Sequence, residues 1–311
     1  MMSNDYVRTY GHEDENGEWV RPIPKPTDEY TYQWNHEWAD DEDKPILKIT
    51  KSSLGSFKWC NKQYEFSYID RRPQDQTEAM LKGTIIHDAY EDFYKAADVK
   101  KMENMSFLEV NDYMTGLFPI SDYSEMTDTI AAFEAQRFVD ARNLDKIEEW
   151  MPEGNEIMLD AEITIGANDN MKYPLTRDYV VHLQGIIDRV YTEDGNSIPF
   201  ELKTGVWKDS KKTTMRREMA YYKLLMESSP DWDGTITHWG WYYPASNYVY
   251  VEEVSRRSET AMKKSLAELI YSYENGYFKP SYFHKKCVHC SYVGICPAAI
   301  DAELNSGSGW I

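Results

Sequence analysis

The segment GIIDRVYTEDGNSIPFELKTG, residues 185–205, combines a β-hairpin signal with charged residues at regular positions. Asp194-Gly195 is typical of a two-residue turn, and the apolar residues on either side are typical of strands. A turn at these two residues sets the register of the hairpin, and in that register Asp188 lies directly opposite Glu201. The segment therefore predicts two antiparallel strands that bring two carboxylates together.

Facing carboxylates need a reason, because like charges at opposed positions destabilise a strand pair. A divalent cation between Asp188 and Glu201 would provide one, since Mg²⁺ is commonly held by one or two carboxylates. Lys203 lies two residues beyond Glu201 and therefore on the same face of the strand. Two acids, a metal and a lysine suit hydrolysis, because the metal activates water and the lysine positions it or stabilises phosphoryl charge. The alternative is a solvated surface hairpin with alternating charges.

Outward from the hairpin, helix and strand patterns alternate along the chain. Thr50 is among the candidate N-caps of a short helix running through Leu54, Phe57 and Tyr64. Further helices are predicted at 77–97, over most of 103–150, at 215–229 and at 258–276. Further strands are predicted at 156–166, 237–245 and 248–255.

Composition and charge limit the class of protein. The chain has 311 residues, 41% hydrophobic and 14% aromatic, as in globular proteins, and its net charge of −19 disfavours a general nucleic-acid binder. Residues 1–45 are acidic and are expected to form an irregular extension packed through Trp19, Trp34 and Trp38, whereas residues 203–217 are basic.

No apolar run approaches the roughly 20 residues of a membrane span, and the start has no signal-peptide pattern. A cytoplasmic location is expected.

Three of the four cysteines lie in CVHCSYVGIC, residues 287–296, and the fourth is Cys60. In a reducing compartment such clusters bind metal more often than they form disulfides. Four thiolates suit either a zinc ion or an iron–sulfur cluster. The residues alone leave both metals open.

Short motifs, in their order along the chain, resemble those of the PD-(D/E)XK nucleases. They are GTIIH (83–87), GIID (185–188), ELKTG (201–205) and EMAYY (218–222). Together with the cysteines, they resemble the branch that contains RecB-type exonucleases, AddB and the CRISPR-associated Cas4 proteins. The resemblance covers roughly residues 46–300.

This resemblance implies an α/β fold with a restriction-endonuclease-like core, in which helices flank a central mixed sheet. The nuclease domain would span residues 46–280, with a helical insertion at about 100–150, after the extension 1–45. Residues 281–311 would form an iron–sulfur tail that closes onto Cys60. A structural [4Fe–4S] cluster would be held by Cys60, Cys287, Cys290 and Cys296. A four-cysteine zinc site is the alternative.

The resemblance also implies roles for single residues. Mg²⁺ or Mn²⁺ would be held by His87, Asp188, Glu201 and the Leu202 carbonyl, and Lys203 would orient water or stabilise the transition state. DNA would be positioned by Tyr222, Lys208, Lys211, Lys212, Arg216 and Arg217. Glu218 stands where glutamine is usual, and Glu162 fits a strand that precedes the aspartate motif in many relatives.

The implied function is a metal-dependent DNA exonuclease that cleaves phosphodiester bonds in single-stranded DNA or at DNA ends. One alternative is a catalytically silent DNA-binding or assembly subunit. Another is a subunit that trims DNA only within a recombination or CRISPR adaptation complex. The sequence lacks the GxxxxGK(S/T) phosphate loop, so any unwinding requires a partner helicase.

Overall fold

The computed structural model describes the side chains of residues 47–70, 72, 77–118 and 122–302, and the backbone alone of 12–13, 19–20, 34–38, 45–46 and 303–306. The chain divides into two compact units. Unit 1 comprises residues 1–75, 162–184 and 260–311, and unit 2 comprises residues 76–161 and 185–259. The domain limits expected from the sequence stay predictions. The expected packing of Trp19, Trp34 and Trp38 lies outside the described side chains.

Unit 2 contains the hairpin. β6 (Tyr179–Glu193) turns into β7 (Asn196–Leu202) through Asp194 and Gly195, whose φ angles of 50° and 76° suit a two-residue hairpin turn. The two strands pair in antiparallel fashion as far as Arg189 opposite Phe200, in the register expected from the turn. The predicted register is confirmed for these pairs.

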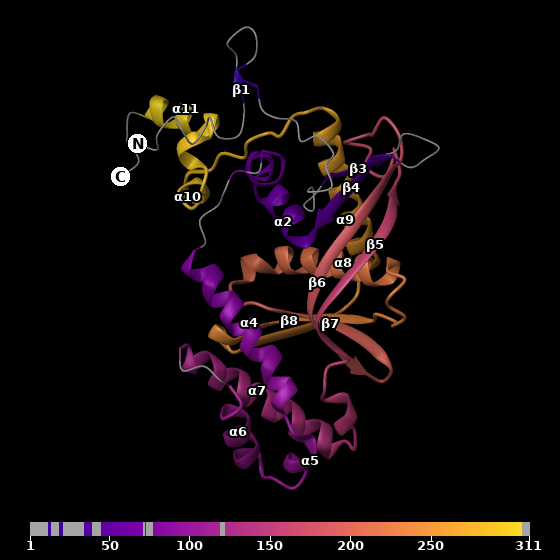
Figure 1. The fold of residues 1–311 in the computed structure, drawn as a ribbon, viewed down its shortest axis with the longest axis vertical. Helices are drawn as coiled ribbons and strands as arrows, with labels where there is room; N and C mark the ends of the chain where they lie inside the picture. The colour runs from indigo at the N-terminus through magenta and orange to yellow at the C-terminus, as the bar shows by residue number, and fades with distance from the viewer. Residues whose placement is uncertain are drawn as a thin grey trace. The chain divides into compact units, whose positions relative to one another are not determined.

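The sheet of unit 2 is mixed and covered on both faces. β7 pairs in parallel with β8 (His238–Tyr243), and β8 pairs in antiparallel fashion with β9 (Tyr248–Glu253). In Figure 1, α8 (Lys212–Ser228) lies on one face of β7 and β8. The helices α4 (Glu78–Ala96) and α7 (Ser124–Asn143) lie on the other face. β7 is buried at almost every position because helices cover both of its faces. The predicted α/β architecture with a mixed sheet flanked by helices is confirmed.

Several helices lie on the α4 side of the sheet, and the insertion expected at about 100–150 stays a prediction. The helices are α4 (Glu78–Ala96), α5 (Val99–Met102), α6 (Phe107–Thr115), α7 (Ser124–Asn143) and the 3₁₀ turn η2 (Ile147–Glu149). Their apolar side chains form one core with Phe200, Leu202 and Tyr242 of the sheet. This core fixes α4 against β7, and α4 carries His87.

In unit 1, β4 (Pro45–Thr50) pairs with the first part of β6 in parallel and with β3 (Trp34–Trp38) in antiparallel fashion. Thr50 caps α2 (Lys51–Trp59) through a capping box, as expected. The expectation of one helix through Tyr64 was wrong, because Cys60 has extended backbone angles (φ −161°, ψ 118°). α2 ends there, and α3 (Asn61–Tyr64) begins after it.

The remaining elements complete the two units. β5 (Gly154–Ile165), which pairs with β6, and α9 (Arg256–Glu274) each contribute residues to both units. The others are β1 (His12–Glu13), β2 (Trp19–Val20), the π-helix η1 (Glu65–Ile69), η3 (Asp209–Lys211), η4 (Pro244–Ser246), α10 (His284–Cys287), η5 (Val293–Ile295) and α11 (Pro297–Ser306). Among the described helices, none has the length and apolar character that a membrane crossing requires.

Candidate active site

Three side chains of unit 2 converge where the hairpin meets α4. His87 Nδ1 lies 3.2 Å from Glu156 Oε1 and 3.8 Å from Asp188 Oδ1. One ligand atom from each residue lies within 4.8 Å of the other two, and the described part of the chain holds no other such group of three His, Cys, Asp or Glu. An imidazole nitrogen with two carboxylate oxygens suits a divalent cation such as Mg²⁺ or Mn²⁺.

Asp188 and Glu201 lie one step beyond the last regular pair of the hairpin. At this step the hydrogen-bond acceptor is a side chain instead of a backbone carbonyl, because Asp188 Oδ2 accepts the hydrogen bond from the Leu202 N–H at 2.7 Å. The two carboxylates that the hairpin was expected to bring together are both buried, since Asp188 is 5% exposed and Glu201 is 1% exposed. The Leu202 contact found here is made through the N–H group, and the carbonyl ligand stays a prediction.

Lys203 joins the site through two carboxylates. Its Nζ forms an ion pair with Glu201 and lies 2.9 Å from Glu218 Oε2. Burial alone would lower the pKa of Lys203, but the charges of Glu201, Glu218 and Asp188 raise this pKa well above its usual value. Lys203 is therefore a cation suited to binding phosphate charge and unsuited to accepting a proton.

α8 supports the hairpin through Gly185 and Tyr222. A Cβ atom at Gly185 would lie 3.1 Å from a leucine of α8 and 3.7 Å from the Tyr222 ring, so glycine lets the helix approach closely. Tyr222 is 0% exposed, and its hydroxyl donates to the Ile186 carbonyl at 2.7 Å. Burial, together with the charges of Glu201 and Asp188, raises the pKa of Tyr222. Tyr222 therefore supports the strand that carries Asp188, and its expected contact with DNA stays a prediction.

Glu156 is not among the site residues expected from the sequence. Its φ of 46° is rare for a residue with a Cβ atom and costs roughly 1–3 kcal/mol. Alternation along a regular strand would group Glu156 with Glu162, which is exposed and lies outside the group of three. The kinked backbone instead lets Glu156 reach His87, and a pattern that assumes a regular strand contains no sign of this.

The basic run after β7 contains two kinds of cation. Arg216 is committed to Glu252, with Nε 2.7 Å from Oε1 and a second bond from Nη2 to Oε2. Arg217 is partly buried, and burial lowers its pKa. Lys208 is exposed and precedes η3, Lys211 ends η3, and Lys212 begins α8. These lysines form no ion pair among the described residues, and the expected DNA contacts of the whole run stay a prediction.

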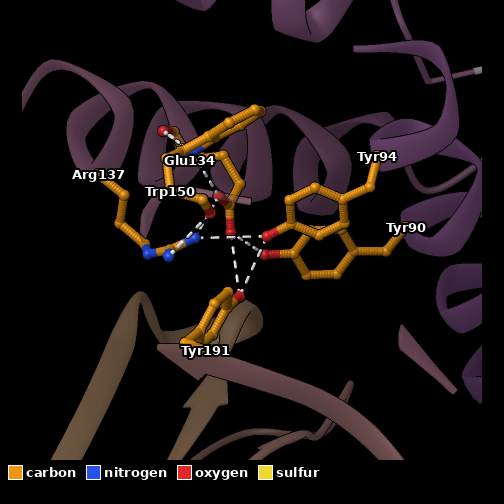
Figure 2. Close-up of polar contacts among 6 residues, drawn as sticks. All are labelled: Tyr90, Tyr94, Glu134, Arg137, Trp150 and Tyr191. Carbon is orange, nitrogen blue, oxygen red and sulfur yellow. Dashed lines mark hydrogen bonds and ion pairs between the residues drawn. The ribbon is translucent and has the colours of Figure 1, made fainter. Parts of the chain in front are cut away.

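A buried polar network connects the elements that carry His87 and Asp188. Figure 2 shows Glu134 of α7 at its centre, where the carboxylate accepts hydrogen bonds from Tyr90, Arg137, Trp150 and Tyr191. Tyr90 comes from α4, as does His87, and Tyr191 comes from β6, as does Asp188. The Arg189 guanidinium lies 3.4 Å from the centre of the Tyr90 ring. The network therefore helps to set the approach of α4 to β6.

The four cysteines of unit 1, Cys60, Cys287, Cys290 and Cys296, line one pocket and form no disulfide. The Ser281 N–H donates to Cys60 Sγ at 3.4 Å. Burial, with the negative charge of the other three sulfurs, raises the pKa of Cys290. Tyr292 fastens the tail, since its hydroxyl donates to the Arg72 carbonyl at 3.0 Å and its ring packs on Phe66. The fold thus gathers the cysteines that the sequence predicts to share a site.

A family model and a solved structure are similar to this chain. Among solved structures, that of SSO0001 has 15% sequence identity and a TM-score of 0.32, over 72% of this chain and 99% of that one. No curated protein matches. The model of the PD-(D/E)XK nuclease superfamily matches residues 48–297. Because this match spans most of the chain, the protein belongs to the PD-(D/E)XK nuclease superfamily.

Proposed function

We propose that the protein is a metal-dependent DNA exonuclease of the Cas4/RecB type, which hydrolyses phosphodiester bonds in single-stranded DNA or at DNA ends. The observation that carries the proposal is the convergence of His87, Glu156 and Asp188 beside the Glu201–Lys203 ion pair. Superfamily membership supports a metal-dependent nuclease. The DNA substrate and the exonuclease action are what the proposal adds.

The charge balance of the site fits a divalent cation. Four carboxylates gather there, from Glu156, Asp188, Glu201 and Glu218, and the protein cations that act on them are His87, Arg189, Lys203 and Arg217. When the histidine is neutral, as a metal ligand must be, four negative charges face three positive ones. Mg²⁺ or Mn²⁺ held by His87, Glu156 and Asp188 would balance the excess and supply Lewis-acid activation of water and phosphate.

The protein's own groups then have separate tasks. Lys203, kept protonated by its carboxylate neighbours, binds the scissile phosphate and stabilises the charge that develops on it. Glu201 orients Lys203 through their ion pair. The Leu202 N–H holds one oxygen of Asp188 and leaves the other near His87. Positions held in this way need little rearrangement when substrate arrives.

The four cysteines, in this proposal, hold a [4Fe–4S] cluster of structural role. The four cysteines line one pocket, and cysteine thiolates are the usual protein ligands of such clusters. A four-cysteine zinc site is the alternative. The cluster would fasten the C-terminal tail to the end of α2.

Glu218 favours one alternative, a catalytically silent DNA-binding or assembly subunit. Its carboxylate contacts Lys203 at 2.9 Å and competes with phosphate for that lysine. In either case the proposed partners are DNA and a helicase, recombination or CRISPR adaptation complex.

A cleavage assay on end-labelled single-stranded DNA tests the proposal, with protein purified without oxygen and supplied with Mg²⁺ or Mn²⁺. We expect metal-dependent cutting that disappears in Lys203→Ala and persists in Lys100→Ala, which removes an exposed lysine of unit 2. DNA binding without cutting by the cluster-loaded wild type would contradict the nuclease proposal and favour the silent subunit.

Visible absorption together with iron, sulfide and zinc analysis tests the cluster. We expect iron and sulfide in the wild type and their loss in Cys60→Ala and Cys296→Ala. Stoichiometric zinc in protein purified without oxygen would overturn the assignment.

A further inference from the structure

Aromatic rings and lysines form a second group of side chains in unit 2. This aromatic platform consists of Trp207, Tyr248, Tyr250, Lys208, Lys211 and Lys212. The rings of Trp207 and Tyr248 stack with centroids 4.4 Å apart and 9° between their planes. Tyr250 lies two residues along β9, and its ring is parallel to that of Tyr248 within 6°. All three aromatic side chains are only partly buried, so part of this aromatic surface is accessible.

Trp207 is held in place before any ligand binds. Its backbone N–H donates to Ser246 Oγ at 2.9 Å, and its indole N–H donates to Asp209 Oδ1 at 3.2 Å. Its ring also packs near the buried Trp241, with centroids 6.1 Å apart. A ring fixed in this way loses little conformational freedom on binding a ligand.

The lysines of the platform lack the carboxylate partners that neutralise their neighbours. In the run 203–217, Lys203 and Arg216 form ion pairs, whereas no ion pair among the described residues joins Lys208, Lys211 or Lys212 to a carboxylate. Lys211 Nζ donates to the Val206 carbonyl at 2.7 Å, and Lys212 Nζ donates to the Tyr250 hydroxyl at 2.6 Å. Burial and repulsion from Lys208 and Lys203 lower the pKa of Lys211. An anion placed here would be attracted.

Tyr243 connects the platform with the metal site. Its ring lies 5.1 Å from the Trp207 ring, and Lys211 Nζ lies 5.2 Å from its centre. Lys203 is close enough for its charge to oppose the effect of burial, which raises the pKa of Tyr243 to about 12. The loop that carries Trp207 and Lys208 also follows directly from Lys203 along the chain.

We propose that the aromatic platform binds the unpaired bases of a DNA strand, while its lysines contact the phosphates, so that the adjoining site receives single-stranded in preference to double-stranded DNA. Stacking on aromatic side chains is available to any base with an accessible face, which paired bases within a duplex lack. Lysines beside the rings follow the backbone without reading sequence. This inference rests on the proposed function and names its substrate class.

Binding of fluorescein-labelled oligo(dT) and of a blunt hairpin duplex, followed by anisotropy in EDTA, tests the proposal without cleavage. We expect Tyr248→Leu and Trp207→Leu each to weaken oligo(dT) binding about tenfold and duplex binding less than about twofold. Tyr248→Phe keeps the ring and should bind like the wild type. Val251→Ala, on the opposite face of β9 and 47% exposed, is the matched control and should change neither affinity.

Equal affinity of the wild type for the two DNAs, no binding of either, or equal losses on both in the leucine variants would overturn the platform. The Tyr248 and Val251 variants keep the test decisive if Trp207→Leu fails to fold. A metal-dependent cleavage assay separates the two proposals. If the wild type cleaves DNA but the leucine variants bind oligo(dT) as tightly as the wild type, the platform proposal alone is wrong. If the leucine variants bind oligo(dT) more weakly but the wild type does not cleave, the nuclease proposal alone is wrong.

Discussion

Two places in unit 2 contain buried carboxylates and differ in what surrounds these charges. Glu134 is 0% exposed, and its oxygens accept hydrogen bonds from four side chains (Figure 2), those of Tyr90, Arg137, Trp150 and Tyr191. Burial and the charge of Glu134 raise the pKa values of Tyr90 and Tyr191, so these hydroxyls remain donors. A buried charge supplied with enough donors stabilises the structure around it.

The metal site has the opposite balance. Glu156 and Asp188 converge on the single imidazole of His87, while Glu201 and Glu218 share Lys203. Buried carboxylates occur in both places, so burial alone does not identify a functional site. What separates them is the charge balance, because Glu134 is paired with Arg137, whereas the four carboxylates of the metal site outnumber Arg189, Lys203 and Arg217. A divalent cation would correct this imbalance.

The largest expected effect is on cleavage. Glu156→Gln and Asp188→Asn each remove one carboxylate charge from the group of three. Loss of a residue that only supports a metal ligand can lower activity by about a hundredfold, so loss of a ligand itself should lower the rate of DNA cleavage by more than that. Glu162→Gln, in the same strand as Glu156 but exposed, is the control and should keep the wild-type rate. Gel assays of end-labelled DNA measure this, and an active Asp188→Asn variant would remove the proposed metal site.

The next largest effect is on folding. Glu134→Gln leaves Arg137 without its charged partner and should lower the free energy of unfolding by about 3 kcal/mol, the lower end for a broken buried pair because Arg137 keeps some exposure. Denaturant unfolding checks this. Glu125→Gln, exposed on the same helix, should change stability by less than about 0.5 kcal/mol. Equal free energies of unfolding for the two variants would mean that the hydrogen bonds and ion pair of Glu134 do not contribute to stability.

Metal binding sharpens the contrast further. Mn²⁺ at a hundred times its dissociation constant should stabilise the wild type by about 2.7 kcal/mol. Asp188→Asn should lose this gain, whereas Glu134→Gln should keep it on a lower baseline, because its site for the cation is intact. Unfolding curves recorded with and without Mn²⁺ measure this gain in the free energy of unfolding. An equal gain in the wild type and both variants would mean that the cation binds at another site.

The smallest effect is expected at Glu218. Glu218→Gln keeps a hydrogen-bond acceptor for Lys203 but removes a competing charge, so the lysine should bind substrate phosphate more strongly. A partly exposed ion pair contributes about 0.2–1 kcal/mol, so KM should fall by about threefold with kcat changed less than about twofold. Steady-state cleavage kinetics measure both, and a higher KM would mean that Glu218 assists Lys203 instead of restraining it.

Local patterns predicted the hairpin well and its surroundings less well. Asp194 and Gly195 favour one turn type, and that turn alone sets the register as far as Arg189. Glu156 could not be found in the same way, because its left-handed backbone departs from the strand pattern around it. Likewise, the break at Cys60 interrupts a helical pattern that continues in the sequence on both sides.

The sequence by itself determined the hairpin register, through turn chemistry. It also indicated the nuclease superfamily and the mixed sheet flanked by helices, through short motifs that resemble those of known nucleases. Only the tertiary structure decided that Glu156 joins His87 and Asp188, that Tyr222 is buried beneath them, and that Lys203 is shared by Glu201 and Glu218. Apart from the Glu201–Lys203 pair, which is two residues apart, these contacts join α4, α8 and the strands across longer sequence separations. The direction of each side chain there depends on how whole elements pack, which no local pattern contains.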